Sequence, residues 1–290
     1  MSIRALSREL SCSCDSVLNR VDRLSRQGIA LHSFLRRLAK PREAVCFDGL
    51  VSFDRSQYFP NDIGLSITAQ SRFILGMTHV TTKRSGCQTA KQKEKSKILY
   101  KKLSFEKKGI DRSFREHLDL LKAERPIERG NPLIIITDEK KEYRRVFLRH
   151  PLIMKQTQNH PCGQLQINSK LPRNYANRLF ASNYLDREIR KDQAQHRRET
   201  TCFCQNVANG MNRLSTFAVY HNYHKRYLIK WPVNRKETHA RMAGIKEKLI
   251  KKARDKMFRQ RSFLSQLTLR DMDKRYGLNL IIRQRRGRSF

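Results

Sequence analysis

The chain has 290 residues, with 62 Lys or Arg against 26 Asp or Glu, which gives a formal net charge of +36. Such an excess of like charge repels itself in a compact state and predicts a polyanionic partner. Nucleic acid is the first choice, because phosphate contacts by Lys and Arg release counterions and supply most non-specific affinity. No run approaches 18 apolar residues and no signal-peptide pattern opens the chain, so we expect an intracellular protein without a membrane partner.

Two helices separated by a polar turn are predicted for residues 2–38. Both show apolar residues at helical spacing, and Ser13 or Asp15 is expected to open the second helix as its N-cap. This order is typical of a helix-turn-helix, whose second helix binds phosphates or base edges. The exposed residues of that helix are expected to be Asn19, Arg20, Arg23 and Arg26. An ordinary helical hairpin with solvated arginines is the alternative.

A three-stranded antiparallel unit is predicted next, with strands over 44–53, 61–69 and 72–81 separated by turn-forming residues. The following stretch, 83–109, is strongly basic, and we expect a mobile loop there. Apolar residues at helical spacing then predict a helix over 111–124.

The second half of the chain alternates strands with helices. A strand over 132–137 precedes a helix over 139–149, and a short strand over 163–168 precedes a long helix from about 183 to 199. A further helix is predicted over 203–224, and the remaining residues are rich in Lys and Arg.

The order β-β-β-α-β-α-β-α predicts an α/β protein with a ribonuclease-H-like mixed five-stranded sheet flanked by helices. We expect three parts: a small all-α helix-turn-helix segment over 1–40, the ribonuclease-H-like domain over 41–230, and a basic helical tail over 231–290. In this layout the middle of the first strand is adjacent to the end of the fourth. Asp48 and Asp138 fall at these two positions.

A carboxylate at the edge of a buried strand is costly to desolvate unless a positive group meets it. Two such acids in a basic chain predict a divalent-metal site that acts on a polyanion. Two Mg²⁺ (or Mn²⁺) ions can support in-line phosphoryl displacement, and Mg²⁺ prefers oxygen ligands. We expect Asp48 to bridge both ions and Asp138 to bind one, although Asp138 is also placed to be the N-cap of the following helix.

A third acid should come from the long helix that packs beside the sheet. Asp186 is favoured, because the beginning of that helix is the part that reaches the active edge. Glu188 lies half a turn further on, and Glu199 lies about three and a half turns below Asp186. Glu199 is therefore the main rival to Asp186, and the choice stays open. A solvated acid paired with a neighbouring arginine is the ordinary alternative for each of them.

Five segments together resemble DDE-type transposases of bacterial insertion sequences. They are Phe47–Phe53, Ile136–Asp138, Asn183–Glu188, His196–Phe203 and His221–Lys225. The resemblance covers most of residues 1–245, and it rests on the order of the segments more than on any one of them. In that family the third acid is usually a glutamate with a basic residue seven positions on, whereas Asp186 is followed by Gln193. Relatives often begin with a longer DNA-binding segment, so we expect this chain to be shortened at its N-terminus.

The resemblance implies an enzyme of DNA recombination that binds insertion-sequence ends and catalyses Mg²⁺-dependent strand cleavage and transfer. It names Asp48 and Asp138 as the first two metal ligands. It also implies terminal repeats and target DNA as partners, a homo-oligomer on DNA, and a bacterial cytoplasmic location at the nucleoid. Two alternatives remain: a non-catalytic basic nucleic-acid-binding protein, either a decayed transposase or an RNA-associated factor, and a ribonuclease-H-like nuclease without strand transfer.

Overall fold

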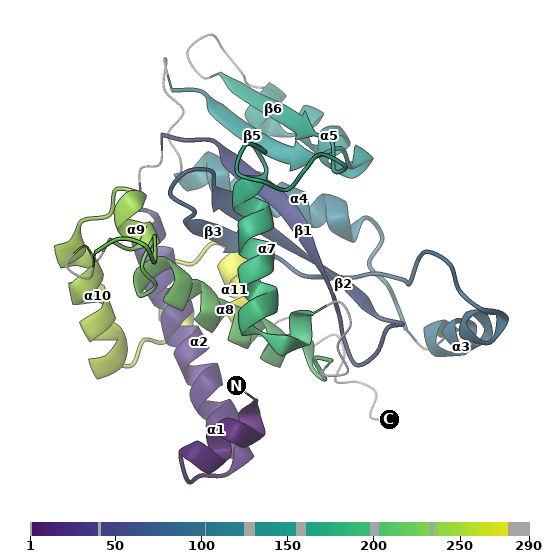
Figure 1. The fold of residues 1–290 in the computed structure, drawn as a ribbon, viewed down its shortest axis with the longest axis horizontal. Helices are drawn as coiled ribbons and strands as arrows, with labels where there is room; N and C mark the ends of the chain where they lie inside the picture. Colours follow the sequence, from purple (N-terminus) through teal and green to yellow (C-terminus); the bar gives the residue numbers. More distant parts are fainter. Residues whose placement is uncertain are drawn as a thin grey trace.

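The computed structural model describes residues 2–39, 42–101, 103–124, 131–154, 161–197, 203–232, 235 and 237–277. Within them, six strands form one mixed sheet flanked by helices (Figure 1). The strands are β1 (Val45–Phe53), β2 (Pro60–Thr68), β3 (Ile74–Met77), β4 (Val80–Thr81), β5 (Leu133–Asp138) and β6 (Cys162–Ile167). The predicted α/β class and mixed sheet are therefore confirmed.

The sheet has the order β3-β2-β1-β5-β6, and the short β4 pairs with β2. Strands β1, β2 and β3 are antiparallel neighbours, while β5 and β6 run parallel to β1. The third strand predicted over 72–81 is divided at Thr78 and His79, which gives six strands instead of five. Both residues are buried, and Thr78 donates its backbone N–H to Gly64, so the interruption is held by packing.

The helices are α1 (Ile3–Glu9), α2 (Cys14–Arg36), α3 (Ala90–Lys101), α4 (Gly109–Glu124), α5 (Lys141–Leu148), α6 (Pro151–Met154), α7 (Phe180–Asp192), α8 (Val207–Tyr223), α9 (His239–Met242), α10 (Glu247–Arg259) and α11 (Asp271–Gly277). Two 3-10 helices are η1 (Ala194–His196) and η2 (Leu264–Gln266). The predicted pair of N-terminal helices is confirmed, and Ser13 is the N-cap of α2, accepting from the backbone N–H of Ser16.

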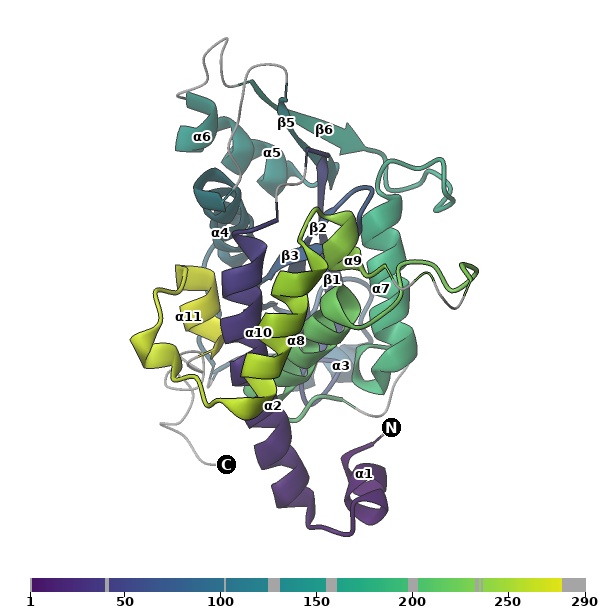
Figure 2. The same cartoon turned by 90° about the vertical axis from the view of Figure 1, so that its left-hand side faces the viewer.

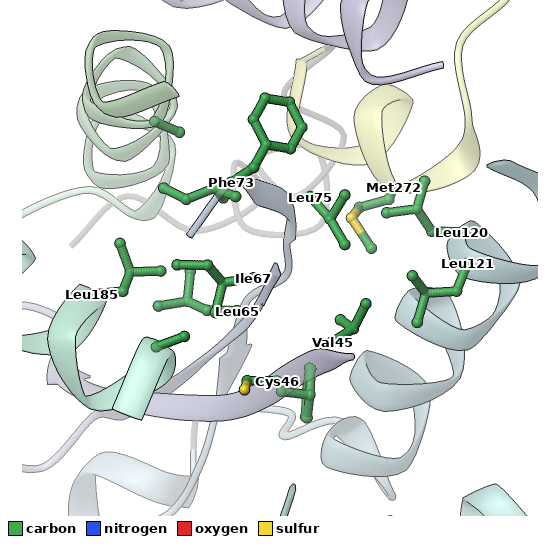
Figure 3. Close-up of a cluster of buried hydrophobic side chains, with 14 of the residues drawn as sticks. Val45, Cys46, Leu65, Ile67, Phe73, Leu75, Leu120, Leu121, Leu185 and Met272 are labelled. Atoms are coloured by element: carbon green, nitrogen blue, oxygen red, sulfur yellow. The ribbon is translucent and has the colours of Figure 1, made fainter. Parts of the chain in front are cut away.

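Helices cover the two faces of the sheet because alternate residues of β1 point to opposite sides. On one face, the ring of Phe47 contacts the rings of Phe114 from α4 and Tyr143 from α5. On the other, β1 and β2 pack against α7, whose Leu185 and Ile189 are fully buried. Figure 3 shows part of the resulting core, in which side chains from the strands, α4, α7 and α11 meet.

The free edge of β3 is covered by side chains from α2 and α8. Asn222 of α8 accepts from the backbone N–H of Ile74 and donates to its carbonyl, both at 2.9 Å. Arg36 of α2 donates to the carbonyl of Leu75 at 3.0 Å. These contacts satisfy an edge that otherwise invites pairing with another chain. Figure 2 shows α2, α8 and α10 between α4 on one side and α7 on the other.

The C-terminal segment is helical, as we expected of the basic tail, but it also packs onto the body, which we did not expect. Helix α10 buries Ile250 and Met257 and contacts α2, and Met272 of α11 lies in the main core. The apolar residues of α10 recur at helical spacing among the lysines. This periodicity indicates a packed helix, but the prediction gave more weight to the charge of the segment. The last part of the predicted basic tail, residues 278–290, lies outside the described residues.

Two other predictions were wrong in their boundaries. The stretch 83–109 contains helix α3, where we expected a mobile loop. Helix α7 ends at Asp192 instead of continuing to about 199, because Gln193 is extended and buried, and its side chain donates to the carbonyl of Arg213 at 3.1 Å. That contact with α8 is tertiary, and the local sequence did not reveal it.

Candidate active site

The two strand acids lie at the same level of neighbouring strands. Cys46 of β1 is registered with Ile136 of the parallel strand β5. Asp48 and Asp138 each follow two residues later, so both side chains emerge on the same face of the sheet, and neighbouring strands lie about 4.8 Å apart. The face is the one covered by α7, since the thiol of Cys46 lies 3.4 Å from the carbonyl oxygen of Arg178, just before that helix.

Asp186 of α7 joins these two acids at a cavity of about 150 Å³. The cavity is also lined by amides and cations, among them Asn168, Asn183, Lys140, Arg173 and Arg190. Helix α7 begins at Phe180, so Asp186 lies in its second turn, next to the fully buried Leu185. The structure thus brings together Asp48, Asp138 and Asp186, which the sequence predicted as the metal-binding set.

The two rival acids are not at this cavity among the described residues. Glu188 forms an ion pair with Lys225 instead, and both side chains are largely buried. Glu199 lies outside the described residues, and α7, on which it was expected, ends seven residues before it. Within the described chain, Asp186 is therefore the helical acid that accompanies the strand pair.

Asp48 carries a poorly compensated charge. Burial, together with the nearby negative charges of Asp138 and Asp62, raises its pKa from 3.8 to about 6 against the opposing effect of Lys140. The backbone N–H of Gly49 donates to Asp48 Oδ1 at 2.7 Å, which favours the ionised form without reversing the shift. A cation placed beside Asp48 would relieve this charge.

Lys140 belongs to the site, and Asp62 influences it from the other face of the sheet, although the sequence analysis selected neither. Lys140 lines the cavity, and its ammonium group lies 3.5 Å from Asp62 Oδ2 and 3.1 Å from the hydroxyl of Tyr143. Burial alone lowers the pKa of Lys140, but Asp62, Asp138 and Asp48 together raise it above its ordinary value. Asp62 showed the same signal as Asp48, an acid in a buried strand, and that signal was overlooked.

Gly49 makes room for the carboxylate of Asp62. A Cβ atom at position 49 would lie 2.5 Å from Asp62 Oδ1, closer than atoms can approach. Asp62 is registered with Val51 on the neighbouring strand, so its side chain leans across Gly49 on the face opposite Asp48. Packing against Asp62 thus explains why a glycine follows Asp48.

Arg190 compensates the third acid. One guanidinium nitrogen lies 3.7 Å from Asp186 Oδ2, one helical turn away, and both side chains are mostly shielded from solvent. The acids of the cavity thus share it with two cations, Lys140 from the segment after β5 and Arg190 on the helix. Their positive charges offset part of the repulsion among the three carboxylates.

The donor set suits a hard divalent cation. Three carboxylates and the amides of Asn168 and Asn183 offer oxygen atoms, and neither His nor Cys lines the cavity. Mg²⁺ takes a few carboxylates and keeps several waters, which a cavity of this size can hold. In the described part of the chain, however, no three His, Cys, Asp or Glu side chains lie close enough to form a metal-binding group. The residues fit a hydrated cation better than a fully protein-ligated one.

The N-terminal helices present the arginines that the sequence placed on their surface. Asn19, Arg20, Arg23 and Arg26 are all exposed on the first four turns of α2. The second half of α2 is different, because Leu31 and Leu35 lie in the core with the residues of β1. One continuous helix of 23 residues therefore connects the exposed arginines to the sheet that carries Asp48.

Among the described residues, no helix is both long and apolar enough to cross a lipid bilayer. No known family model, curated protein or solved structure matches the chain.

Proposed function

We propose that this protein is a DDE-type transposase, which binds DNA and uses Mg²⁺ or Mn²⁺ to cleave and join DNA strands. The observation that carries the proposal is the placement of Asp48, Asp138 and Asp186 at one cavity, two of them at the same level of neighbouring parallel strands. A protein that only binds nucleic acid gains nothing from three carboxylates facing its phosphates. Acids gathered against that repulsion favour metal-assisted phosphoryl transfer.

The strand order supports a ribonuclease-H-like core. Strand β1 lies between the antiparallel meander of β2 and β3 on one side and the parallel strands β5 and β6 on the other. The adjacency of β1 and β5 is the one that we expected for this fold. In it, the acid of the central strand and the acid that ends the next parallel strand are neighbours. Helix α7 then supplies the third acid across one face of the sheet.

In the proposed mechanism, Asp48, Asp138 and Asp186 would hold the divalent cations. Cations held there would lower the pKa of an attacking water or 3′-hydroxyl and would stabilise the leaving oxygen. Asp48 must be ionised to bind them, and its pKa of about 6 leaves it largely so at neutral pH. Lys140 and Arg173, both lining the cavity, are placed to neutralise the phosphate that enters it.

DNA binding by the N-terminal helices completes the proposal. The exposed Arg20, Arg23 and Arg26 fit contacts with phosphates or base edges, as in a helix-turn-helix. The net charge of +36 favours non-specific association with DNA at low salt. Element ends as the specific site, and a homo-oligomer assembled on them, follow from the resemblance to transposases and belong to the proposal.

Cleavage and Mn²⁺ binding test the site together. Asp48→Asn and Asp138→Asn should lower plasmid nicking in Mn²⁺ by at least about a hundredfold, since a metal supplies several kcal/mol and each tenfold in rate is about 1.4 kcal/mol. Asp186→Asn should do the same, whereas Glu188→Gln, on the same helix but paired with Lys225, should stay near wild type. Joined oligonucleotide product separates a transposase from a nuclease without strand transfer.

Mn²⁺ binding followed by electron paramagnetic resonance provides a readout that is independent of turnover. The three Asp→Asn variants should bind less Mn²⁺ while their affinity for duplex DNA is kept. Equal loss of DNA binding and nicking would count against a dedicated metal site. Wild-type nicking that the three variants retain would remove these acids from the mechanism.

A non-catalytic nucleic-acid-binding protein is the second candidate. The observation that favours it is the ion pair between Asp186 and Arg190, which compensates the third acid without a metal. This candidate predicts tight, salt-sensitive DNA binding with neither Mn²⁺ binding nor nicking. Arg190→Gln distinguishes the two: it should leave Mn²⁺ binding intact or stronger in an enzyme, and it should leave it absent in a simple binder.

A further inference from the structure

Helix α3 has a composition that its own packing does not explain. Of its twelve residues five are lysines, one is the acid Glu94, and Ser96 alone is buried. It projects from the body beyond β2, at the right-hand end of the molecule in Figure 1. Its apolar residues Ile98, Leu99 and Tyr100 are consecutive, so they form no apolar stripe along the helix, and Ile98 is exposed. Its charge therefore calls for a reason outside the fold of the chain.

The helix nevertheless has a capped start, and it is attached to the body near its end. At its start, Thr89 and Gln92 form a reciprocal capping box, with each side chain accepting from the other's backbone N–H at 3.3 and 3.1 Å. Near its end, the hydroxyl of Tyr100 donates to the carbonyl of Tyr58 at 2.7 Å and accepts from the N–H of Arg84 at 2.9 Å. We call this anchored helix, Thr89–Lys101, the α3 arm.

Aromatic packing strengthens the anchor. The ring of Tyr100 meets those of Phe59 and Phe105 edge-on, with centroids 6.1 and 5.0 Å apart. The two phenylalanines come from the chain just before β2 and from the segment that leads into α4. The α3 arm is thus held at a fixed angle to the sheet, which a solvated loop would not require.

Lys93, Lys97 and Lys101 form a row on the α3 arm. They recur every four residues and are all exposed, so they share one side of the helix over about 12 Å. None of the three has an acidic partner in the part of the chain that the structure describes. One strand of B-DNA presents a phosphate about every 3.4 Å of its axis, so three or four phosphates span this row.

Helix α10 offers an internal comparison, because it carries the same row. Lys248, Lys252 and Lys256 also recur every four residues and are exposed. The opposite side of α10, however, buries Ile250 and Met257 against α2, so its lysines are the solvated side of a packed amphipathic helix. The row on α10 is explained by folding, and the row on the α3 arm is not.

We propose that Lys93, Lys97 and Lys101 bind the phosphate backbone of double-stranded DNA. A duplex is stiff over about 50 nm, so DNA held at the acidic cavity continues straight past the body and can meet an arm that projects from it. A flexible single strand has no need of a rigid row. This inference rests on the proposed function, because it takes the bound duplex to be the substrate of the cavity.

Two triple variants test the α3 arm. One is Lys93→Gln, Lys97→Gln and Lys101→Gln; its matched control is Lys248→Gln, Lys252→Gln and Lys256→Gln. Both remove three positive charges at identical spacing, and Gln keeps the helix propensity of Lys. Affinity for a labelled duplex of about three helical turns is measured by fluorescence anisotropy between about 50 and 200 mM salt. Circular dichroism confirms that both variants are folded.

The slope of log affinity against log salt should fall by about 2.7 in the α3 variant, which is three contacts at about 0.9 each. In the α10 variant it should fall by less than about 1. Equal slopes in the two variants would overturn the inference, since only net charge would then matter. An equal loss of affinity for a single-stranded RNA would also overturn it, because the row would then be a general anion contact.

Failure of the inference is distinguishable from failure of the proposed function. If the wild type nicks plasmid DNA and the α3 variant keeps its salt slope, the proposed function of the cavity is supported and DNA binding by the α3 arm is rejected. If the wild type neither binds the duplex nor nicks plasmid, both proposals are rejected.

Discussion

Two buried aspartates of this protein have pKa values shifted in opposite directions. Asp273 of α11 lies against Arg36, whose guanidinium group donates to it at 2.7 Å and to Glu124 at 2.6 Å. Burial alone would raise the pKa of Asp273, but Arg36 outweighs burial and the pKa is lowered. The cation near Asp48 is Lys140, whose effect does not outweigh burial and the neighbouring acids, and the pKa of Asp48 is raised to about 6.

The difference distinguishes Asp273, whose charge stabilises the fold through Arg36, from Asp48, whose buried charge destabilises it. The Arg36 cluster joins α2, α4 and α11, and each partner is matched by hydrogen bonds. Asp48 and Asp138 at the cavity, and Asp62 on the other face of the sheet, all interact with the ammonium group of Lys140. Acids kept in an unfavourable state against a stability penalty are typical of functional sites.

The largest expected effect on stability is that of Arg36→Met. It leaves Glu124 and Asp273 buried without their cation, and breaking a buried ion pair in this way costs about 3–5 kcal/mol. Urea unfolding at pH 7 measures the loss. Arg26→Met is the matched control on the same helix, because Arg26 pairs with Asp22 at the surface and the change should stay within about 0.5 kcal/mol. Equal effects at both positions would contradict the structural role of Arg36.

Asp48→Asn should raise the free energy of unfolding at pH 7, whereas Arg36→Met lowers it. Between pH 4 and 6 the folded state holds a proton on Asp48 that the unfolded state releases, so wild-type stability falls as pH rises through this window. The full shift, from 3.8 to about 6, corresponds to about 3 kcal/mol above pH 6. The variant should therefore be more stable than wild type at pH 7 by up to that amount, with no gain below pH 4. Unfolding in EDTA at both pH values checks this, and a destabilised variant at pH 7 would refute it.

Asp273→Asn should show a smaller effect with the reverse pH dependence. The lowered pKa of Asp273 contributes stability that is present above its ordinary pKa and is lost as pH falls through the folded-state value. The free energy of unfolding of the variant should be lower by about 1–3 kcal/mol at pH 7, the range for a buried polar group that loses its hydrogen-bond partner. The loss stays in this range because Arg36 keeps its ion pair with Glu124. Thermal unfolding from pH 7 down to pH 3 should show the difference shrinking. A constant difference would exclude the charge as its source.

Local patterns predicted most of the elements around the cavity. Alternating or continuous apolar runs placed β1, β2, β5 and β6, and helical spacing placed α1, α2, α4, α5 and α8. Each signal depends only on residues within a few positions of one another. The α3 arm was also signalled locally, by the capping box of Thr89 and Gln92, but its charge was taken as the mark of a loop.

Long-range contacts accounted for what was missed. The end of α7 depends on Gln193 reaching α8, and Lys140 enters the site because its side chain spans from the end of β5 to Asp62 on β2. The docking of α11 depends on Arg36, 237 residues earlier in the chain. Neither periodicity nor composition carries information about such pairs.

The sequence by itself determined that two acids stand at buried strands of a strongly basic α/β chain. Tertiary structure decided which helical acid accompanies them, which cations compensate them, and that Asp48 is shifted upward while Asp273 is shifted downward. The sequence gives the position of each carboxylate along the chain. Its pKa and its partners, however, are set by burial and by charges that only folding brings near.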